Sequence, residues 1–310
     1  MMKFEGIQAF VAIAESGSIS AAARRLDLST SVVSERLSRL EESLGVALMQ
    51  RTTRKLTLTE DGTTFLERAR GILSEVENAR VELAERRGGL AGPLRISAPV
   101  SFGMLHLGPA LYRFMHEHPK VEITLDLDDR FVDPASDGFD AVIRIGNIAD
   151  RRLTAKVLAP SRRLMVASPA YLDANGTPQT LEDLRNHAAI LYSLRGGDDW
   201  QFSVRGKPVV VKPKAALTVN NGDVMRDAAE AGLGLSLLPS FIVADSVAAG
   251  RLKRVEVGAD VAADSLQIAH VRRVGIPQRV GALVDFLSES FGPEPYWDRE
   301  IANARKLADG

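Results

Sequence analysis

The stretch AAARRLDLSTSVVSERLSRLE, residues 21–41, places two runs of helical periodicity on either side of a short polar break. The first run has one apolar face, at i, i+3, i+4 and i+7, formed by Ile19, Ala22, Ala23 and Leu26. Asp27, Leu28 and Ser29 follow, and they combine a residue that tolerates tight turns with a good helix N-cap. The break therefore predicts a tight turn between two short helices.

The second run has an apolar face that must pack inward, formed by Val33, Leu37, Leu40 and Leu44. Its opposite face is small and polar, with Ser31, Glu35 and Ser38, and with Ser34 and Arg39 beside it. Such a pair of helices is typical of a helix-turn-helix, whose second helix enters the major groove of DNA. Periodicity alone also allows an ordinary helical hairpin with a solvated polar face, so both interpretations stay open here.

The segment LMQRTTRKLTLT, residues 48–59, follows these helices. Its threonines, the basic pair Arg54–Lys55 and the alternating Leu56 and Leu58 predict a two-stranded wing whose tip reaches DNA. Residues 18–58 contain seven basic and four acidic side chains, a net charge of +3, whereas the whole chain has −1. Any surface for nucleic acid must therefore be local, and this region has the right sign.

Composition limits the remaining possibilities. The chain has 310 residues, of which 45% are hydrophobic and 25% charged, as is typical of globular proteins. It has no cysteine, which excludes disulfides, thiolate metal sites and thiol redox sensing. The N-terminal residues MMKFEGIQAF do not resemble a signal peptide, and no run of about 18 uncharged apolar residues follows. We expect a cytoplasmic protein without a membrane partner.

A long helix is predicted from its cap at Thr59 to about Arg87. Its apolar residues alternate steps of three and four, at Phe65, Leu66, Ala69, Ile72, Leu73, Val76, Ala79 and Leu83. This pattern indicates a helix that pairs with another helix, although packing on its own chain is the alternative. A dimer is favoured, because helix-turn-helix proteins use twofold symmetry on paired half-sites.

The glycine-rich junction RRGGLAGPL, residues 86–94, separates this helical part from an α/β part. Strands are predicted there at 94–99, 121–128, 140–146, 162–168, 188–193, 208–213, 233–239 and 266–271. Helices are predicted at 103–117, 222–232, 240–249 and 277–290. The tail 293–310 is expected to be loosely attached, with a short helix after Asp298.

With these segments in order, the chain resembles the LysR-type transcriptional regulators over residues 4–297. Its N-terminal part matches in FVAIAESGSISAAARRL (10–26), LSTSVVSERLSRLEESLGVAL (28–48) and RTTRKLTLTEDG (51–62). Its C-terminal part matches in ISAPVSFG (96–103), GFDAVIRIG (138–146), VASPAYL (166–172), AGLGLSLLP (231–239) and AGRL (249–252). An ordered set of this length is far more specific than any single motif.

The resemblance implies an α plus α/β architecture with a winged helix-turn-helix, a linker helix and a two-lobed effector domain like type 2 periplasmic binding proteins. The implied division is 1–58 for DNA binding, 59–88 for the dimerising helix and 89–93 for a hinge. The effector domain would be 94–292, with lobe I at 94–163 and 268–292, lobe II at 164–267, and 293–310 as a tail. The implied partners are promoter DNA, a small effector, RNA polymerase and further copies of the chain, as a homodimer or homotetramer.

Carried onto matching positions, the resemblance assigns DNA contact to Ser29, Thr30, Ser31, Ser34, Arg36, Arg51, Arg54 and Lys55. Two positions depart from the pattern of many members, which have Gln or Pro at Thr30 and Arg or Lys at Glu35. Glu35 can accept a hydrogen bond from a cytosine amino group. Pairing with Arg39, four residues later on the same helix, is the favoured alternative.

The effector site is expected where SAPVSFG ends a strand and begins a helix, since open α/β sheets bind ligands at such ends. The predicted contacts are Pro99, Val100, Ser101 and Phe102, with Arg144 supplying a cation for an anionic, carboxylate-bearing effector. The resemblance adds Phe202, Asn220, Asn221 and Pro239 on the opposite wall. The simpler alternatives are that Ser101 caps its helix and that Arg144 pairs with an acidic neighbour.

No pattern of catalytic or cofactor-binding residues stands out. GLGLSLLP, residues 232–239, lacks the third glycine of a dinucleotide loop and leads into a strand, and the five histidines are scattered. We therefore expect no enzyme activity, metal or cofactor. Two alternatives are kept: a solute-binding module whose N-terminal helices only oligomerise, and an α/β enzyme. Salt-dependent binding to an operator separates a regulator from both.

Overall fold

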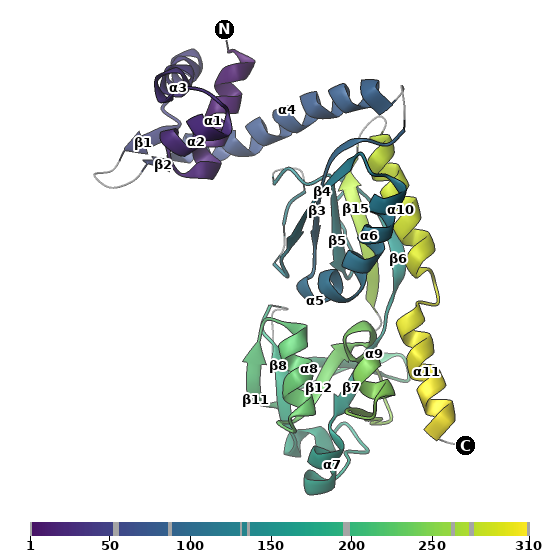
Figure 1. The fold of residues 1–310 in the computed structure, drawn as a ribbon. Coiled ribbons are helices and arrows are strands. Elements are labelled where there is room, and N and C mark those ends of the chain that lie inside the picture. Colours follow the sequence, from purple (N-terminus) through teal and green to yellow (C-terminus); the bar gives the residue numbers. More distant parts are fainter. Residues whose placement is uncertain are drawn as a thin grey trace. The chain divides into compact units, whose positions relative to one another are not determined.

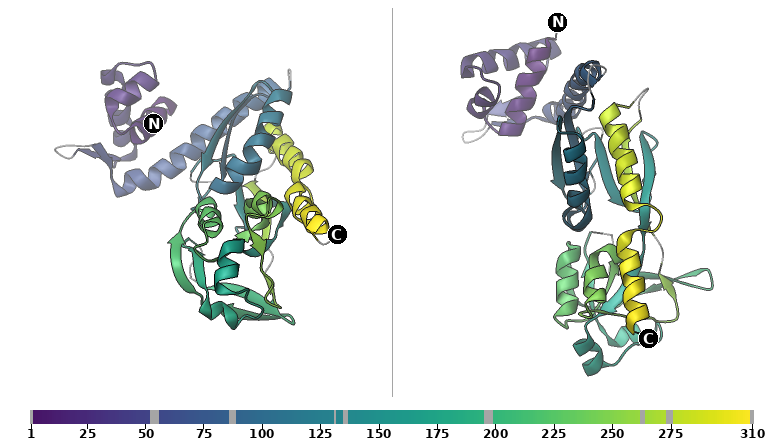
Figure 2. Two further views of the ribbon diagram at one scale, coloured as in Figure 1. Left: turned by 60° about the horizontal axis from the view of Figure 1, so that its bottom comes forward. Right: turned by 45° about the vertical axis from the view of Figure 1, so that its right-hand side comes forward.

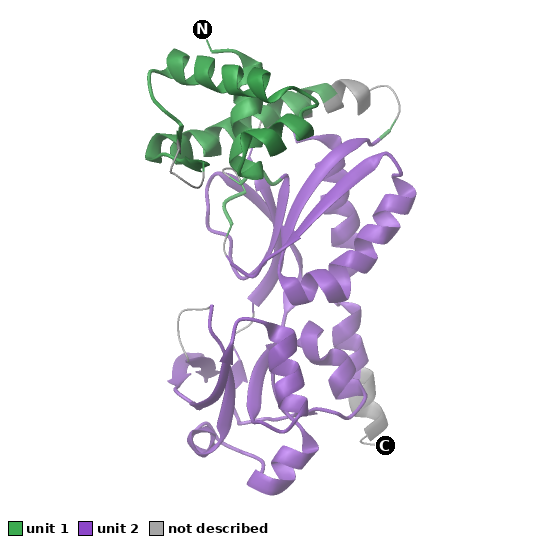
Figure 3. Ribbon diagram, turned by 60° about the vertical axis from the view of Figure 1, so that its left-hand side comes forward, with its two compact units in different colours: residues 1–89, 132–139 green, residues 90–131, 140–310 purple. Residues whose placement is uncertain are grey.

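A computed structural model of the chain describes residues 2–51, 56–85, 89–130, 132–134, 137–194, 199–261, 264–272 and 276–308 (Figures 1 and 2). The chain divides into two compact units (Figure 3). Unit 1 contains residues 1–89 and 132–139, and unit 2 contains residues 90–131 and 140–310. The predicted combination of a helical part and an α/β part is confirmed.

Unit 1 begins with three helices, α1 (Phe4–Ser16), α2 (Ile19–Arg25) and α3 (Thr30–Leu44). Asp27 adopts a positive φ of 54° in the turn between α2 and α3, as the sequence predicts for this break. The wing consists of β1 (Met49–Arg51) and β2 (Leu56–Leu58), which pair antiparallel. The inward faces meet in one core that includes Phe10, Ile13, Val33, Leu40 and Leu48. The helix-turn-helix and the wing are thus confirmed as folded elements.

The long helix α4 (Glu60–Glu85) starts at the predicted cap, where Thr59 Oγ1 accepts a hydrogen bond from the Gly62 N–H at 2.9 Å. Gly62 is required there, because a Cβ would lie 1.9 Å from the Leu48 carbonyl oxygen. Near its start, Leu66 and Ala69 are buried in the core of unit 1. Farther along, Ile72 and Val76 are 39% and 48% exposed, so part of the apolar stripe remains uncovered.

Unit 2 contains two five-stranded sheets, each with its own helices. The sheet of lobe I has the order β4-β3-β5-β15-β6, built from Val121–Leu127, Gly92–Ala98, Ala141–Ile145, Asp264–Val271 and Leu153–Ser161. Strand β3 pairs parallel with β4 and β5, whereas β15 runs antiparallel to β5 and β6. The helices of this lobe are α5 (Val100–Phe102), which continues through a π-helical turn at Gly103–Leu107, α6 (Gly108–Glu117) and α10 (Gln278–Phe291).

The sheet of lobe II has the order β11-β8-β12-β7-β13, built from Lys214–Val219, Ala188–Tyr192, Leu235–Pro239, Arg163–Ala167 and Lys253–Arg254. Its helices are α7 (Pro169–Asn175), a 3-10 turn at Asp183–Asn186, α8 (Gly222–Glu230) and α9 (Ser240–Ala248). A small sheet of order β10-β9-β14 joins Lys207–Val211, Trp200–Val204 and Asp260–Val261. The chain passes between the lobes at β6–β7 and again before β15.

Five strands of this unit escaped the sequence pattern: β6, β9, β11 and the two-residue strands β13 and β14. Strands β6 and β11 lie at the edges of their sheets, where many side chains are exposed, so their apolar runs are short. Strand β9 forms a hairpin with β10 through Arg205 and Gly206, both with positive φ. Edge strands and hairpins bury one face at most, which weakens the continuous apolar signal of a central strand.

The expectation of a loosely attached tail is wrong. Helix α11 (Tyr296–Ala308) begins before Asp298 and packs against α9 of lobe II (Figure 2). Trp297 is 1% exposed, and its ring lies among those of Phe102, His106, Phe241 and Phe291. A short tail gains attachment when one large aromatic side chain is buried. In the part of the chain that the structure describes, no helix is both long and apolar enough to span a membrane.

Candidate DNA-reading and effector sites

The N-terminal half of α3, with its N-cap Ser29, carries five of the eight residues predicted to contact DNA. Ser29 Oγ accepts a hydrogen bond from the Val32 N–H at 3.3 Å, so Ser29 is the N-cap. Its hydroxyl also lies 2.9 Å from that of Ser31. The side chains of Ser29, Thr30 and Ser31 are exposed, and those of Ser34 and Arg36 are half-buried. Because the Ser29 hydroxyl is hydrogen-bonded as the cap and its side chain is still exposed, the start of α3 presents a small polar surface.

The remaining predicted DNA contacts are in the wing. Arg51 ends strand β1. Arg54 and Lys55, at the expected tip of the wing, lie outside the described residues. The structure therefore supports the strands of the wing and leaves its basic pair as a prediction.

Two carboxylates of α3 are held within unit 1. Glu35 pairs with Arg39 at 2.5 Å between Oε1 and Nη2, as the favoured alternative predicted. Glu41 Oε1 accepts hydrogen bonds from the backbone N–H groups of Leu48 and Met49 at 2.7 and 3.0 Å. This second role was missed by sequence reasoning, since nothing in the periodicity marks Glu41 as the link between α3 and the wing. Glu41 thus fixes where β1 begins relative to α3.

A cavity of about 560 Å³ lies in unit 2 and is lined by residues of both lobes. Four predicted effector residues line it: Pro99, Ser101, Arg144 and Pro239. The other predicted residues lie elsewhere. Phe102 and Phe202 are buried in core clusters, Val100 is next to the cavity-lining residues in sequence, and Asn221 caps α8 through the Val224 N–H at 3.0 Å. Asn220 is exposed just before that cap.

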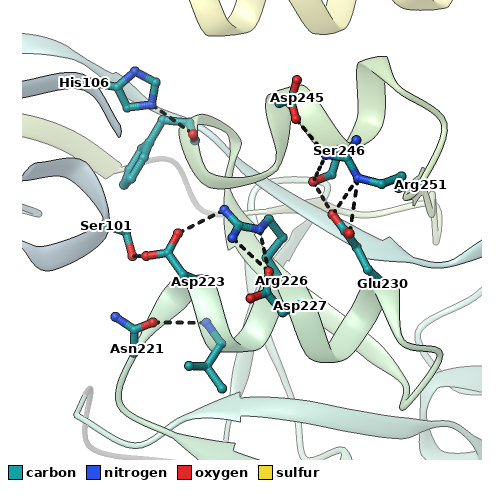
Figure 4. Close-up of polar contacts among 12 residues, drawn as sticks. Ser101, His106, Asn221, Asp223, Arg226, Asp227, Glu230, Asp245, Ser246 and Arg251 are labelled. Carbon is teal, nitrogen blue, oxygen red and sulfur yellow. Dashed lines mark hydrogen bonds and ion pairs between the residues drawn. The ribbon is translucent and has the colours of Figure 1, made fainter. Parts of the chain in front are cut away.

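Ser101 connects the two lobes. Its Oγ donates to Asp223 Oδ2 on α8 at 2.6 Å, and Asp223 Oδ1 accepts from Arg226 at 3.0 Å (Figure 4). Neither the predicted anion contact nor the simple helix cap describes this bond. Asp223 had no signal in the sequence, because 122 residues separate it from its partner.

The backbone amide that follows Pro99 is also occupied. The Val100 N–H donates to Asp129 Oδ1 at 3.0 Å, so a carboxylate of the chain itself lies where an anion was expected. Burial raises the pKa of Asp129, while hydrogen bonds from Val100 and Tyr192 act in the opposite direction. Asp129 lines the cavity and was not predicted.

Arg144, the residue predicted to supply a cation, lines this cavity. Its Nη1 donates to the Ile143 carbonyl at 2.6 Å, and its Nη2 donates to Ser97 Oγ at 2.9 Å. Its Nε is buried without a hydrogen-bond partner among the described residues. Burial lowers the pKa of Arg144, and the nearby charges of Asp128, Asp129 and Asp126 raise it. The guanidinium is therefore positioned by neutral oxygens, and its Nε–H donor is unused.

We find no metal-binding arrangement of three or more His, Asp or Glu side chains in the described part of the chain. The buried His106 is instead bonded within the fold. Its Nε2 lies 3.0 Å from the Phe241 carbonyl and its Nδ1 lies 2.5 Å from the Tyr296 hydroxyl. His106 thus connects lobe I to α9 and α11.

Two family models match the chain and together cover nearly all of it up to residue 292. Residues 4–63 match the bacterial regulatory helix-turn-helix of the LysR family, and residues 87–292 match the LysR substrate binding domain. The solved full-length AphB, a virulence activator of Vibrio cholerae, is 26% identical with a TM-score of 0.62, over 92% of this chain and 98% of that chain. CrgA of Neisseria meningitidis is 30% identical with a TM-score of 0.60, over 92% and 97%.

Curated relatives agree with this match over most of their own lengths. The chain is 35% identical to the regulator PtxR of Pseudomonas aeruginosa, over 94% of this chain and 93% of PtxR. It is 31% identical to the regulator DmlR of Escherichia coli, over 92% and 93%. With a winged helix-turn-helix, a two-lobed substrate-binding domain and these relatives, the chain belongs to the LysR family of transcriptional regulators.

Proposed function

We propose that this regulator binds promoter DNA through α3 and the wing, and that a small carboxylate-bearing effector in the lobe cavity modulates transcription. The observation that carries the proposal is that one chain contains both an exposed, capped recognition helix and a cavity lined by two lobes. Pockets between lobes are common sites for small ligands, and helix N-termini contact phosphate or base edges. The proposed DNA contacts are Ser29, Thr30, Ser31, Ser34, Arg36, Arg51, Arg54 and Lys55.

The proposed division of labour follows the predicted boundaries. DNA binding is assigned to 1–58, pairing to 59–88, a hinge to 89–93 and effector binding to 94–292. The assignment of α4 to pairing is supported by Ile72 and Val76, whose exposure leaves an apolar stripe for a second copy. The active form would be a homodimer or homotetramer that contacts RNA polymerase in the cytoplasm, where promoter DNA lies.

The proposed effector site uses the lining residues Pro99, Ser101, Arg144 and Pro239. Arg144 supports a carboxylate-bearing effector, because its buried Nε has an unused donor. The adjacent Ser101–Asp223 bond joins the lobes and is a contact that an effector can replace or reinforce. The occupied Val100 amide argues that the carboxylate binds at Arg144 instead of at the start of α5.

A gel-shift titration with the DNA upstream of the chain's own gene tests the proposal, at two salt concentrations and against a scrambled competitor. We expect specific binding that weakens steeply with salt, because phosphate contacts release counterions. Ser34→Ala or Arg54→Ala should weaken this binding and leave the oligomeric state unchanged. Ser290→Ala, in α10 of unit 2, is the matched control.

Specific binding with unchanged affinity in both variants would contradict the assigned reading surface. Binding without preference over the competitor, repeated with upstream DNA from neighbouring operons, would favour the alternative of a solute-binding module that oligomerises through its helices.

A further inference from the structure

Asp129 is an unusual residue for the wall of a cavity in a carboxylate receptor. It accepts the Val100 N–H at 3.0 Å and a hydrogen bond from Tyr192. In the part of the chain that the structure describes, Asp129 forms no ion pair, because no Lys, Arg or His nitrogen lies within 4.0 Å of its carboxylate oxygens. Burial raises the pKa of this carboxyl above its ordinary value. A half-buried carboxylate without a counterion costs free energy unless a ligand supplies the cation.

Arg144, which lines the same cavity, also forms no ion pair among the described residues. Its guanidinium donates hydrogen bonds to neutral oxygens of Ile143, Ser97 and Arg130, and its buried Nε has no partner in the described structure. Asp129 influences its pKa through charge, yet the two side chains form no ion pair. One wall thus presents a cation and an anion that are separated from each other.

Two other carboxylates at or near the cavity are engaged within the chain. Asp223 is held by Ser101 and Arg226, and Asp150 pairs with Arg152 at 2.7 Å. The hydroxyl of Ser161, which is 1% exposed and lines the cavity, has no hydrogen-bond partner among the described residues. It adds a neutral donor or acceptor for a polar ligand.

The rest of the lining combines apolar side chains of both lobes with further charged ones. The apolar side chains include Ile145, Ile148, Leu191, Trp200, Met225, Leu238, Phe241 and Ile242, and the charged ones are Asp150, Arg163, Asp199 and Asp264. A ligand that fits must therefore combine charged groups with an apolar body.

We propose that the effector is a zwitterion of the amino-acid class, whose ammonium group binds Asp129 and whose carboxylate binds Arg144. This inference rests on the effector-binding role proposed above and makes Asp129 a specificity-determining residue. A zwitterion supplies a counterion to each side chain, whereas a simple carboxylate leaves Asp129 uncompensated and adds a second negative charge nearby. The apolar lining accommodates an aliphatic or aromatic side chain.

The test is a thermal-shift screen of the full-length protein with the twenty common amino acids, followed by calorimetry. Each amino acid that stabilises the protein is compared with its desamino carboxylate and its decarboxylated amine, for example phenylalanine with 3-phenylpropionate and 2-phenylethylamine. We expect at least one amino acid to bind tenfold or more tightly than both analogues. In Asp129→Asn, its affinity should fall at least tenfold, and the preference over the desamino carboxylate should disappear.

Asp128→Asn is the matched control, since it removes a neighbouring carboxylate that pairs with Arg130 and does not line the cavity. It should keep the preference for the zwitterion. Two results would overturn the inference: no stabilisation by any amino acid, or equal binding of an amino acid and its desamino carboxylate that Asp129→Asn leaves unchanged. Both leave the gel-shift result intact, so a failed inference is distinguishable from a failed regulator function.

Discussion

The helix-turn-helix of unit 1 and the cavity of unit 2 satisfy their polar groups at very different distances along the chain. In the first, Ser29 caps an amide three residues away, Glu35 pairs four residues away and Glu41 reaches seven residues away. In the second, Val100 and Asp129 are 29 residues apart, and Ser101 and Asp223 are 122 apart. The contrast teaches that local rules suffice for a helix-turn-helix, whereas the chemistry of the cavity depends on the assembly of two lobes.

The region around α11 extends the same contrast. His106 and Tyr296 are 190 residues apart, yet they form a hydrogen bond beside the buried Trp297. Arg162, at the crossing between the lobes, lies 3.4 Å from Asp298 of α11. The four variants that follow compare short-range with long-range contacts through their effects on stability.

The largest effect is expected from Trp297→Ala. Removing a fully buried aromatic side chain typically costs about 3–5 kcal/mol of unfolding free energy. Urea denaturation followed by circular dichroism should show the loss in unit 2, whereas α1 to α3 keep their stability. Tyr296→Phe, which retains the ring, is the control and should cost less. A loss below about 1 kcal/mol for Trp297→Ala would mean that α11 is attached loosely after all.

Ser29→Ala should have an intermediate effect, confined to unit 1. Loss of an N-cap hydrogen bond costs about 1 kcal/mol. The loss of stability would be measured from the thermal unfolding transition of unit 1. Ser38→Ala, at an exposed position in the middle of α3, is the control. Ser29→Asp should restore much of the stability, because aspartate is also a good cap. If Ser29→Asp were as unstable as Ser29→Ala, the cap would not be the reason.

A smaller effect is expected from the titration of His106. Burial lowers the pKa of His106 in the folded state, and a hydrogen bond to the Phe241 carbonyl opposes this shift. The unfolded chain therefore takes up a proton first, so stability is full above the ordinary pKa of 6.5 and falls as the pH drops below it. Denaturation between pH 7.5 and 5.5 should show a flatter profile for His106→Gln than for the wild type.

The exposed His116→Gln is the control for this measurement, and its profile should follow that of the wild type. Parallel profiles for His106→Gln and the wild type would remove His106 as a source of acid sensitivity.

The smallest effect is expected from Glu35→Gln. The Glu35–Arg39 pair is more than half exposed on both sides, and such pairs contribute at most about 0.5 kcal/mol. Chemical denaturation should detect little change. Any larger change in operator affinity, measured by gel shift, would show instead that Glu35 acts on DNA. A stability loss above about 1 kcal/mol would place Glu35 among the structural residues of α3.

Much of the fold was predictable because its signals are periodic and local. The helices α2 and α3, the cap at Ser29, the turn at Asp27 and the wing all follow from spacings within a few residues. The central strands of unit 2 were also found, because burial on both faces requires continuous apolar runs. The edge strands β6 and β11 were missed, since exposed faces weaken that signal. The burial of Trp297 was missed because one aromatic residue in a polar tail has no periodicity.

The sequence by itself determined the order of the elements and the place of the helix-turn-helix, because turns, caps and amphipathic faces depend on near neighbours in the chain. It also indicated that Arg144 and Ser101 lie at strand and helix ends, and both residues line the cavity. Only the tertiary structure decided that Asp129 occupies the expected anion contact and that Asp223 binds Ser101 across the lobes. Such pairs form when distant strands and helices pack together, and the spacing of neighbouring residues does not encode which distant residue becomes the partner.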